Sequence, residues 1–428
     1  MILCGAKQVD ITPPIGIPLA GYGARKENSR GIHDPLLAQI IYLNDSVHEL
    51  LLVGLDLVAV DADFVAQIRT GIFQSLQITP EAILVSCTHT HSGPDGYCNT
   101  FPRESANINF PLRQNTVEKL VGAAAWAKTS AREAKFSFGR VGVGDICLNR
   151  NDPAKASDKE LSLLKIESED ETLALLVNYG CHPTVLGPEN LLISADLPGA
   201  ARKYFHKLFP ETVLMFMNGG SGDVSTRFTR RSQDFKELDR FGLLLFSNVI
   251  QAMQTTQPFE VQRVASASSQ VELPLRDFPS IEIAQEELTA YEQEFNKLKN
   301  TPIDRSELRK AETKIQGASA QLKYSKLFRD TKSIRSEIQS FKIGELACVT
   351  IPGEPFAGIT LDIKAAFPDQ PVMVISYAND YMGYFPIDEK NLTYETLKSP
   401  WALNIGEFLV ENCEAMMSQL DDLSNLDK

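Results

Sequence analysis

The chain contains the stretch Ile83-Leu84-Val85-Ser86-Cys87-Thr88-His89-Thr90-His91-Ser92-Gly93-Pro94. An apolar run typical of a buried strand ends in two histidines one residue apart, and a Gly-Pro break follows at once. Because side chains alternate across a strand, His89 and His91 are predicted to emerge on the same face. The sequence holds only 6 histidines. The pair therefore indicates a metal or proton-transfer site, or else a hydrogen-bonded polar pair that closes the strand.

Apolar runs and helical patterns alternate along the rest of the chain. Runs rich in Val, Ile and Leu predict strands at residues 39–42, 50–58, 82–87, 135–143, 173–179, 212–217, 262–273, 339–351 and 372–376. Helical spacing of apolar residues predicts helices at 61–76, 113–129, 197–208, 235–255, 356–367 and 401–419. This interleaving predicts an α/β fold with layered, mixed sheets.

Residues 280–330 differ in composition, because they are rich in Glu, Lys, Gln and Ala. Apolar residues recur there at helical spacing, and Asn300-Thr301-Pro302 interrupts the pattern. We expect two antiparallel helices joined by a short turn, that is, a solvated helical hairpin inserted between core strands. Alternatively, this hairpin could serve as a lid or as a dimer contact. No other boundary is evident, so a single domain over residues 1–428 is predicted.

Composition and charge narrow the class of protein. The 428 residues suffice for a sizeable core, and 43% hydrophobic with 23% charged residues is ordinary for a globular chain. The net charge of −13 gives a mean field that would not attract nucleic acid or an anionic membrane. We therefore expect neither as a partner.

The seven cysteines are odd in number, scattered, and without a Cys-x-x-Cys motif. They are expected to be buried free thiols of a reducing compartment rather than a disulfide framework. The N-terminus lacks the basic and apolar regions of a signal peptide, and no 18-residue apolar run predicts a transmembrane helix. These features together predict a cytoplasmic location.

Further apolar runs end in polar residues beside Gly or Pro. These ends read Gly180-Cys181-His182-Pro183-Thr184, Gly222-Asp223-Val224-Ser225, Pro352-Gly353-Glu354-Pro355 and Tyr377-Ala378-Asn379-Asp380-Tyr381-Met382-Gly383-Tyr384. Loops held by a rigid sheet are a usual place for catalytic residues. Imidazoles with one carboxylate suit Zn²⁺ with an open position for water, whose pKa zinc lowers to about 7. The cysteines lack the spacing of a closed structural zinc site.

These strings, in this order, resemble the neutral, non-lysosomal ceramidases, which are zinc-dependent amidases that cleave N-acyl sphingoid bases. The resemblance covers most of the chain and begins with Val9-Asp10-Ile11-Thr12-Pro13-Pro14, Gly21-Tyr22-Gly23 and Gly31-Ile32-His33-Asp34-Pro35-Leu36. It implies an αββα sandwich as the catalytic domain. The immunoglobulin-like C-terminal domain of the longer ceramidases is expected to be missing.

The resemblance also implies roles for single residues. It places the zinc ligands at His89, His182, Glu354 and Tyr384. It places His91 beside the metal, where it would bond the substrate oxygen or carry a proton. The remaining implied active-site residues are Ser225, the substrate-facing Arg150, and Tyr394, which would help hold the reacting carbonyl.

Each of these residues also has a purely structural interpretation. His182 could close a strand in the core, and Glu354 could cap the helix predicted at 356–367. Tyr384 could be a packed aromatic. Ser225, with Asp223, could shape a tight turn, and Arg150 could pair with a surface acid.

The sequence thus predicts a zinc-dependent hydrolase that cleaves the amide of an N-acyl substrate, either ceramide or a ceramide-like or small N-acyl compound. Thr226-Arg227 follows Ser225 where the family usually has Pro-Asn, which changes the wall of the site. The identity of the N-acyl substrate is therefore left open. Two other classes remain as hypotheses. One is a zinc-dependent ester, lactone or sugar-derivative hydrolase, and the other is a non-catalytic metal-binding interaction protein.

Overall fold

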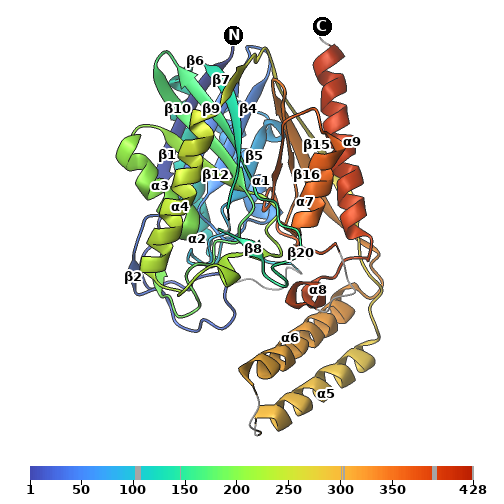
Figure 1. Cartoon of the computed structure of the whole chain (residues 1–428). Coiled ribbons are helices and arrows are strands. Elements are labelled where there is room, and N and C mark those ends of the chain that lie inside the picture. Colours follow the sequence, from blue (N-terminus) through green and yellow to red (C-terminus); the bar gives the residue numbers. More distant parts are fainter. Residues whose placement is uncertain (102–107, 145, 300, 302–303, 388–392, 427–428) are drawn as a thin grey trace.

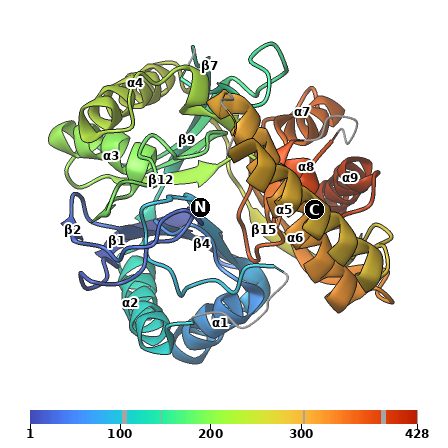
Figure 2. The ribbon, with the colours of Figure 1, turned by 90° about the horizontal axis from the view of Figure 1, so that it is seen from below.

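The computed structural model describes residues 1–101, 108–144, 146–299, 301, 304–387 and 393–426. Within them, three larger mixed sheets surround one central core, and helices cover the outer face of each sheet (Figures 1 and 2). The predicted α/β fold with layered, mixed sheets is confirmed. The third sheet with its helices is an additional layer beside the expected αββα sandwich.

The first sheet carries the histidine motif at one edge. Its strand order is β5-β4-β3-β1-β6, with β1 (Leu3–Asp10), β3 (Leu37–Asn44), β4 (Glu49–Leu55), β5 (Ile83–Cys87) and β6 (Arg132–Glu133). Helices α1 (Ala62–Leu76) and α2 (Phe110–Thr129) cover it. In α1 the carboxylate of Asp61 caps the first turn by accepting from the Phe64 backbone N–H. Phe64, Ile68 and Ile72 then form the buried stripe that faces the sheet.

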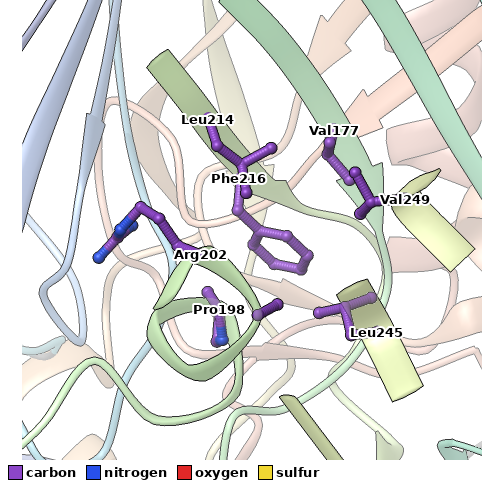
Figure 3. Close-up of a pocket in the computed structure, with 8 residues that line it drawn as sticks. Val177, Pro198, Arg202, Leu214, Phe216, Leu245 and Val249 are labelled. Atoms are coloured by element: carbon purple, nitrogen blue, oxygen red, sulfur yellow. The ribbon is translucent and has the colours of Figure 1, made fainter. Parts of the chain in front are cut away.

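The second sheet packs its inner face against the first. Its order is β12-β10-β9-β7-β14, with β7 (Lys135–Gly142), β9 (Glu160–Ser168), β10 (Glu171–Tyr179), β12 (Val213–Asn218) and β14 (Gln257–Phe259). Helices α3 (Asp196–Leu208) and α4 (Phe235–Gln254) lie outside it. A small pocket between α3, α4 and the sheet is lined mostly by apolar side chains such as Phe216 and Leu245 (Figure 3). The guanidinium of Arg202 at its edge pairs with the buried Asp56.

The third sheet has the order β15-β16-β17-β19, with β15 (Val264–Pro274), β16 (Ser333–Ile343), β17 (Leu346–Thr350) and β19 (Val372–Ile375). Helices α7 (Ala357–Ala366) and α9 (Ile405–Leu426) cover it. The single strand predicted at 339–351 is wrong, because the chain reverses between β16 and β17. Gly344 permits this tight turn with a φ of +58°.

Residues from all three sheets meet in the central core, for example Leu52, Leu176 and Phe341. Short elements gather at one end of the sheets (Figure 1): β2 (Gly31–Ile32) with β11 (Leu192–Ile193), β8 (Leu148–Asn149) with β13 (Val224–Ser225), and β18 (Glu354–Pro355) with β20 (Tyr384–Phe385). Other small elements are the 3₁₀ turns η1 (Pro80–Ala82) and η2 (Thr226–Phe228) and the short helix α8 (Tyr394–Lys398). These short pairings join the distant segments that sequence analysis singled out.

Helices α5 (Ile281–Lys299) and α6 (Arg305–Phe328) follow β15 and project below the sheets (Figure 1). Helix α6 packs on α8, where the Tyr324 hydroxyl donates to the Lys398 carbonyl at 2.8 Å. Gly317 adjoins Leu397 so closely that a Cβ would lie 2.8 Å from the leucine Cβ. Asn300 and Pro302 of the predicted turn lie outside the described residues. The division into one domain with an inserted hairpin at 280–330 remains a prediction.

One expectation about cysteines is wrong. Cys147 and Cys181 form a disulfide, with a Cα–Cα distance of 6.0 Å. The partners are 34 residues apart in sequence and meet only because β8 and the loop after β10 converge, which spacing alone does not reveal. Disulfides are typical of oxidising compartments, so the cytoplasmic location stays a prediction. Among the described residues, no helix is both long and apolar enough to cross a bilayer.

Candidate metal centre and active site

The two histidines of the motif meet, but not by strand alternation. Strand β5 ends at Cys87, and His89 has a φ of +70°, so the chain turns sharply at that residue. The turn brings the Nε2 atoms of His89 and His91 to 3.2 Å from each other. Gly21, with a φ of +93°, makes room for the second ring, because a Cβ there would lie 2.4 Å from the His91 Cγ.

His182 joins this pair from the loop after β10. Its backbone N–H donates to the Val224 carbonyl, and its Nε2 lies 3.1 Å from that of His89. A carbonyl only accepts, so the bonds from His89 Nδ1 to Val58 at 2.6 Å and from His182 Nδ1 to Ser221 at 2.8 Å place a proton on each Nδ1. Both Nε2 atoms therefore present a lone pair to the same point.

Glu354 supplies a carboxylate at this point. Its Oε2 lies 3.4 Å from Nε2 of His89 and 3.5 Å from Nε2 of His182. The hydroxyl of Tyr381 donates to its Oε1, and Tyr377 lies 3.5 Å from its Oε2. Sequence analysis did not predict that these two tyrosines contact Glu354, although both lie in the quoted string that ends at Tyr384.

The helix-cap interpretation of Glu354 is wrong. The first N–H of α7, from Ala357, donates to Oδ1 of Asp223 at 2.8 Å, so another carboxylate fills that role. Asp223 also accepts from the Asn149 side chain at 2.6 Å. Asp223 therefore links β8, β13 and α7 through hydrogen bonds. The Glu354 carboxylate does not cap α7 and faces the imidazoles instead.

The convergence fits a metal ion. Ligand atoms at the usual Zn–N distance in a tetrahedral site are about 3.3 Å apart, close to the separations here. Burial, together with the neighbouring imidazoles and Arg150, holds the pKa values of His91 and His182 well below their ordinary range. Both rings are therefore neutral at pH 7, as metal ligation requires. His89, His91 and His182 form a buried group that could hold a metal ion.

Arg150 and its partners form a second cluster next to the imidazoles. The Arg150 Nε lies 2.7 Å from Oε1 of the buried Glu395, not of a surface acid. Its guanidinium lies over the ring of Tyr384 at 5.5 Å, and Tyr384 meets Tyr394 edge-on at 6.0 Å. Tyr384 pairs with Glu354 in the β18–β20 ribbon. Glu395 was missed, although it follows Tyr394 directly in the sequence.

Ser225 reaches the site through β13. It forms a parallel bridge with His182, and its Oγ accepts from the Arg227 backbone N–H at 3.2 Å. The serine hydroxyl keeps its own hydrogen for another acceptor. The structure thus brings His89, His91, His182 and Glu354 into one cluster. Ser225, Arg150, Tyr384 and Tyr394 lie on the adjoining segments.

Comparisons with known proteins agree with this fold. The family model described as "Neutral/alkaline non-lysosomal ceramidase, N-terminal" matches residues 2–232. The neutral ceramidase of Mycobacterium tuberculosis is 22% identical over 279 residues, which are 56% of this chain and 44% of that protein. Neutral ceramidase 2 of Arabidopsis thaliana is 26% identical over 251 residues, 53% of this chain and 31% of that protein. The aligned region spans less than half the length of these two relatives.

Solved structures share the fold over nearly the whole chain. The crystal structure of neutral ceramidase from Pseudomonas aeruginosa aligns with a TM-score of 0.77 at 18% identity, covering 98% of this chain and 74% of that one. A structure described as ceramidase complexed with C2 aligns with a TM-score of 0.76 at 16% identity, covering 98% and 75%. With the family match over more than half of the residues, the chain belongs to the neutral/alkaline non-lysosomal ceramidase family.

Proposed function

We propose that this protein is a zinc-dependent amidase that hydrolyses an N-acyl substrate of the ceramide type. One observation carries the proposal: Nε2 of His89 and Nε2 of His182 point at one place beside Glu354, because main-chain carbonyls fix both Nδ1 atoms. In this proposal these three residues hold the ion, with Tyr384 as the fourth ligand. A bound Zn²⁺ would supply Lewis acidity toward the carbonyl and a nucleophilic water at neutral pH.

The reaction adds water across an amide. A bond forms between the water oxygen and the carbonyl carbon, the C–N bond breaks, and a proton passes from the water to the departing amine. His91 is suited to carry that proton, because its depressed pKa leaves the ring neutral at pH 7, with a lone pair on one nitrogen, and lets it pass an accepted proton on readily. Its Nε2 is 3.2 Å from that of His89, so it lies beside the proposed ligands.

Hydrogen-bond donors are needed to stabilise the negative charge that develops on the carbonyl oxygen during the reaction. Arg150 is a fixed cation because Glu395 holds its Nε, and the Ser225 hydroxyl has a hydrogen to donate. We assign both, with Tyr394 at the edge of Tyr384, to stabilising that oxygen. Loss of one such donor typically lowers turnover by about 10²- to 10³-fold.

Metal analysis and an amide assay together test the proposal. Purified protein should contain one zinc per chain and cleave a short-chain fluorescent ceramide. His89→Ala and His182→Ala should lose both properties, and His91→Gln should keep the zinc while turnover falls. His48→Gln changes an exposed histidine and serves as the control. Protein without stoichiometric metal and without response to added zinc would refute the proposal. Cleavage of matched esters but not amides would identify an esterase instead.

A further inference from the structure

Three arginines whose charges act on one another lie near the candidate site. Arg227 and Arg230 follow Ser225 within five residues, and Arg309 lies in the first turns of α6. Nη1 of Arg227 donates to the main-chain carbonyl of Arg150 at 3.4 Å. We call Arg227, Arg230 and Arg309 the arginine cluster. Two members are therefore attached to the same segments that position the proposed catalytic residues.

Arg230 is anchored to the segment that carries His182. Its Nη1 donates to the Thr184 carbonyl at 3.0 Å and to Oγ1 of Thr226 at 3.3 Å. It also lies close enough to Tyr22 to favour the ionised phenol, although burial is the larger effect and raises the pKa of that tyrosine. The Tyr22 ring meets the His91 ring edge-on at 4.9 Å. Arg230 and the proposed proton carrier, His91, therefore share Tyr22 as a neighbour.

No carboxylate neutralises the cluster within the part of the chain that the structure describes. None of its members forms an ion pair there, and the acids whose charges reach it are already bonded. Glu395 is held by Arg150 and Asn151, and Asp196 accepts three backbone N–H bonds. Each guanidinium has five N–H donors, and because Arg227 is exposed and Arg230 half-buried, the donors that do not bond to protein face solvent.

The members of the cluster repel one another. Burial is the main cause that lowers the pKa values of Arg227 and Arg230, and the charge of Arg309 adds to it in both. Helix α6, which carries Arg309, packs on α8 below the sheets (Figure 1). Three unpaired cations are kept together in a chain of net charge −13. A bound anion would offset the repulsion and accept hydrogen bonds from the solvent-facing guanidinium donors.

We propose that the arginine cluster binds an anionic group of the N-acyl substrate, either a carboxylate or a phosphate. The inference rests on the proposed amide hydrolysis and specifies its substrate class. The enzyme would then prefer an acylated amino acid or a phosphorylated N-acyl amine to a neutral amide of equal length. Guanidinium groups match both kinds of anion through paired hydrogen bonds.

Three substrates with one acyl chain test this inference on the zinc-loaded full chain. They are N-dodecanoylethanolamine, which is neutral, its phosphate ester, and N-dodecanoylglycine. At low salt, kcat/KM for at least one anionic substrate should exceed that for the neutral one by about 10- to 100-fold, the range of a charge-assisted hydrogen bond. The two anionic substrates distinguish a carboxylate from a phosphate preference. Added NaCl should lower the anionic-to-neutral ratio of kcat/KM.

Variants connect the preference to the cluster. Arg230→Gln and Arg227→Gln should each reduce the anionic-to-neutral ratio at least several-fold, and the double variant should bring it near one. Lys310→Gln is the matched control, because Lys310 is the exposed neighbour of Arg309 and pairs with Glu307. The anionic-to-neutral ratio of kcat/KM for this variant should equal that of the wild type. Zinc content and thermal melting confirm that each variant is folded and loaded.

The failures of the two proposals are distinguishable. Hydrolysis of the neutral amide at least as fast as both anionic ones would overturn the inference and leave the amidase proposal standing. A preference that survives in Arg227→Gln/Arg230→Gln would also overturn the assignment to these residues. Zinc-loaded protein that cleaves none of the three amides would overturn the proposed function and the inference with it.

Discussion

Removing the Cys147–Cys181 disulfide is expected to destabilise the protein measurably. The partners are 34 residues apart, and the chain-entropy relation assigns about 4 kcal/mol to a cross-link that closes a loop of this length. Unfolding entropy near 2.1 cal/mol/K per residue gives about 0.9 kcal/mol/K for 428 residues. The melting temperature of Cys147→Ser/Cys181→Ser should therefore fall by about 4 °C.

Scanning calorimetry with and without a phosphine reductant separates the cross-link from the substitution. Reductant should lower the melting temperature of the wild type by about the same amount and leave the double variant unchanged. Cys348→Ser is the control, because it changes a fully buried free thiol and should retain the wild-type response to reductant. Mass spectrometry of unreduced protein verifies the bond before the comparison.

The disulfide also reaches the site, because Cys181 precedes the proposed ligand His182 and Cys147 lies just before β8. Reduction should therefore weaken zinc binding as well as stability. An equal effect of reductant on wild type and on the double variant would refute this reasoning. So would a cross-linked wild type that melts at the same temperature after reduction.

Three further predictions concern zinc affinity, a buried ion pair and the pH dependence of stability. Tyr381→Phe removes the hydroxyl that donates to the proposed carboxylate ligand, so zinc affinity in a chelator competition should fall about 10- to 100-fold. Arg202→Ala leaves Asp56 buried without its partner and should cost about 3–5 kcal/mol in urea denaturation. In zinc-free protein, stability should fall as the pH drops below 6.5, the ordinary pKa of histidine, because His91 and His182 are neutral when folded and bind protons on unfolding. Two such groups give a slope of up to about 2.7 kcal/mol per pH unit.

Matched changes at the surface control these predictions. Tyr204→Phe also removes a hydroxyl that donates to a carboxylate, that of Asp239, and should leave zinc affinity unchanged. Lys203→Ala breaks an exposed pair with the same carboxylate and should cost less than about 1 kcal/mol. A His91→Asn/His182→Asn variant should lose most of the pH slope. An unchanged slope would show that other groups take up the protons.

The strand and helix pattern could be predicted where apolar spacing was strong. The run at 50–58 corresponds to β4, which is a continuous buried apolar run, and the helix at 61–76 corresponds to α1, which buries one apolar stripe. Strands β1 and β9 were missed, since polar and charged residues interrupt their apolar pattern. The assembly of three sheets around one core depends on packing between residues hundreds of positions apart, which local patterns do not encode.

The site was predictable as a set of residue types but not as a set of contacts. The His-Thr-His motif, His182 and Glu354 were singled out from their positions at the ends of apolar runs. Their meeting through a left-handed turn at His89 could not be read from strand alternation. The hydroxyl contact of Tyr381 with Glu354 likewise depends on how β18 and β20 pair.

The attachment of α5 and α6 has a consequence for protein engineering. The chain leaves the third sheet after Pro274 and returns at Ser333, and these two residues are paired neighbours in β15 and β16. A short connector could therefore replace both helices without shifting the strand register. Since α6 packs on α8, which carries Tyr394 and Glu395, exchanging the hairpin would alter one wall of the candidate site while the scaffold stays the same. The two helices could then be exchanged for other sequences to alter substrate selectivity.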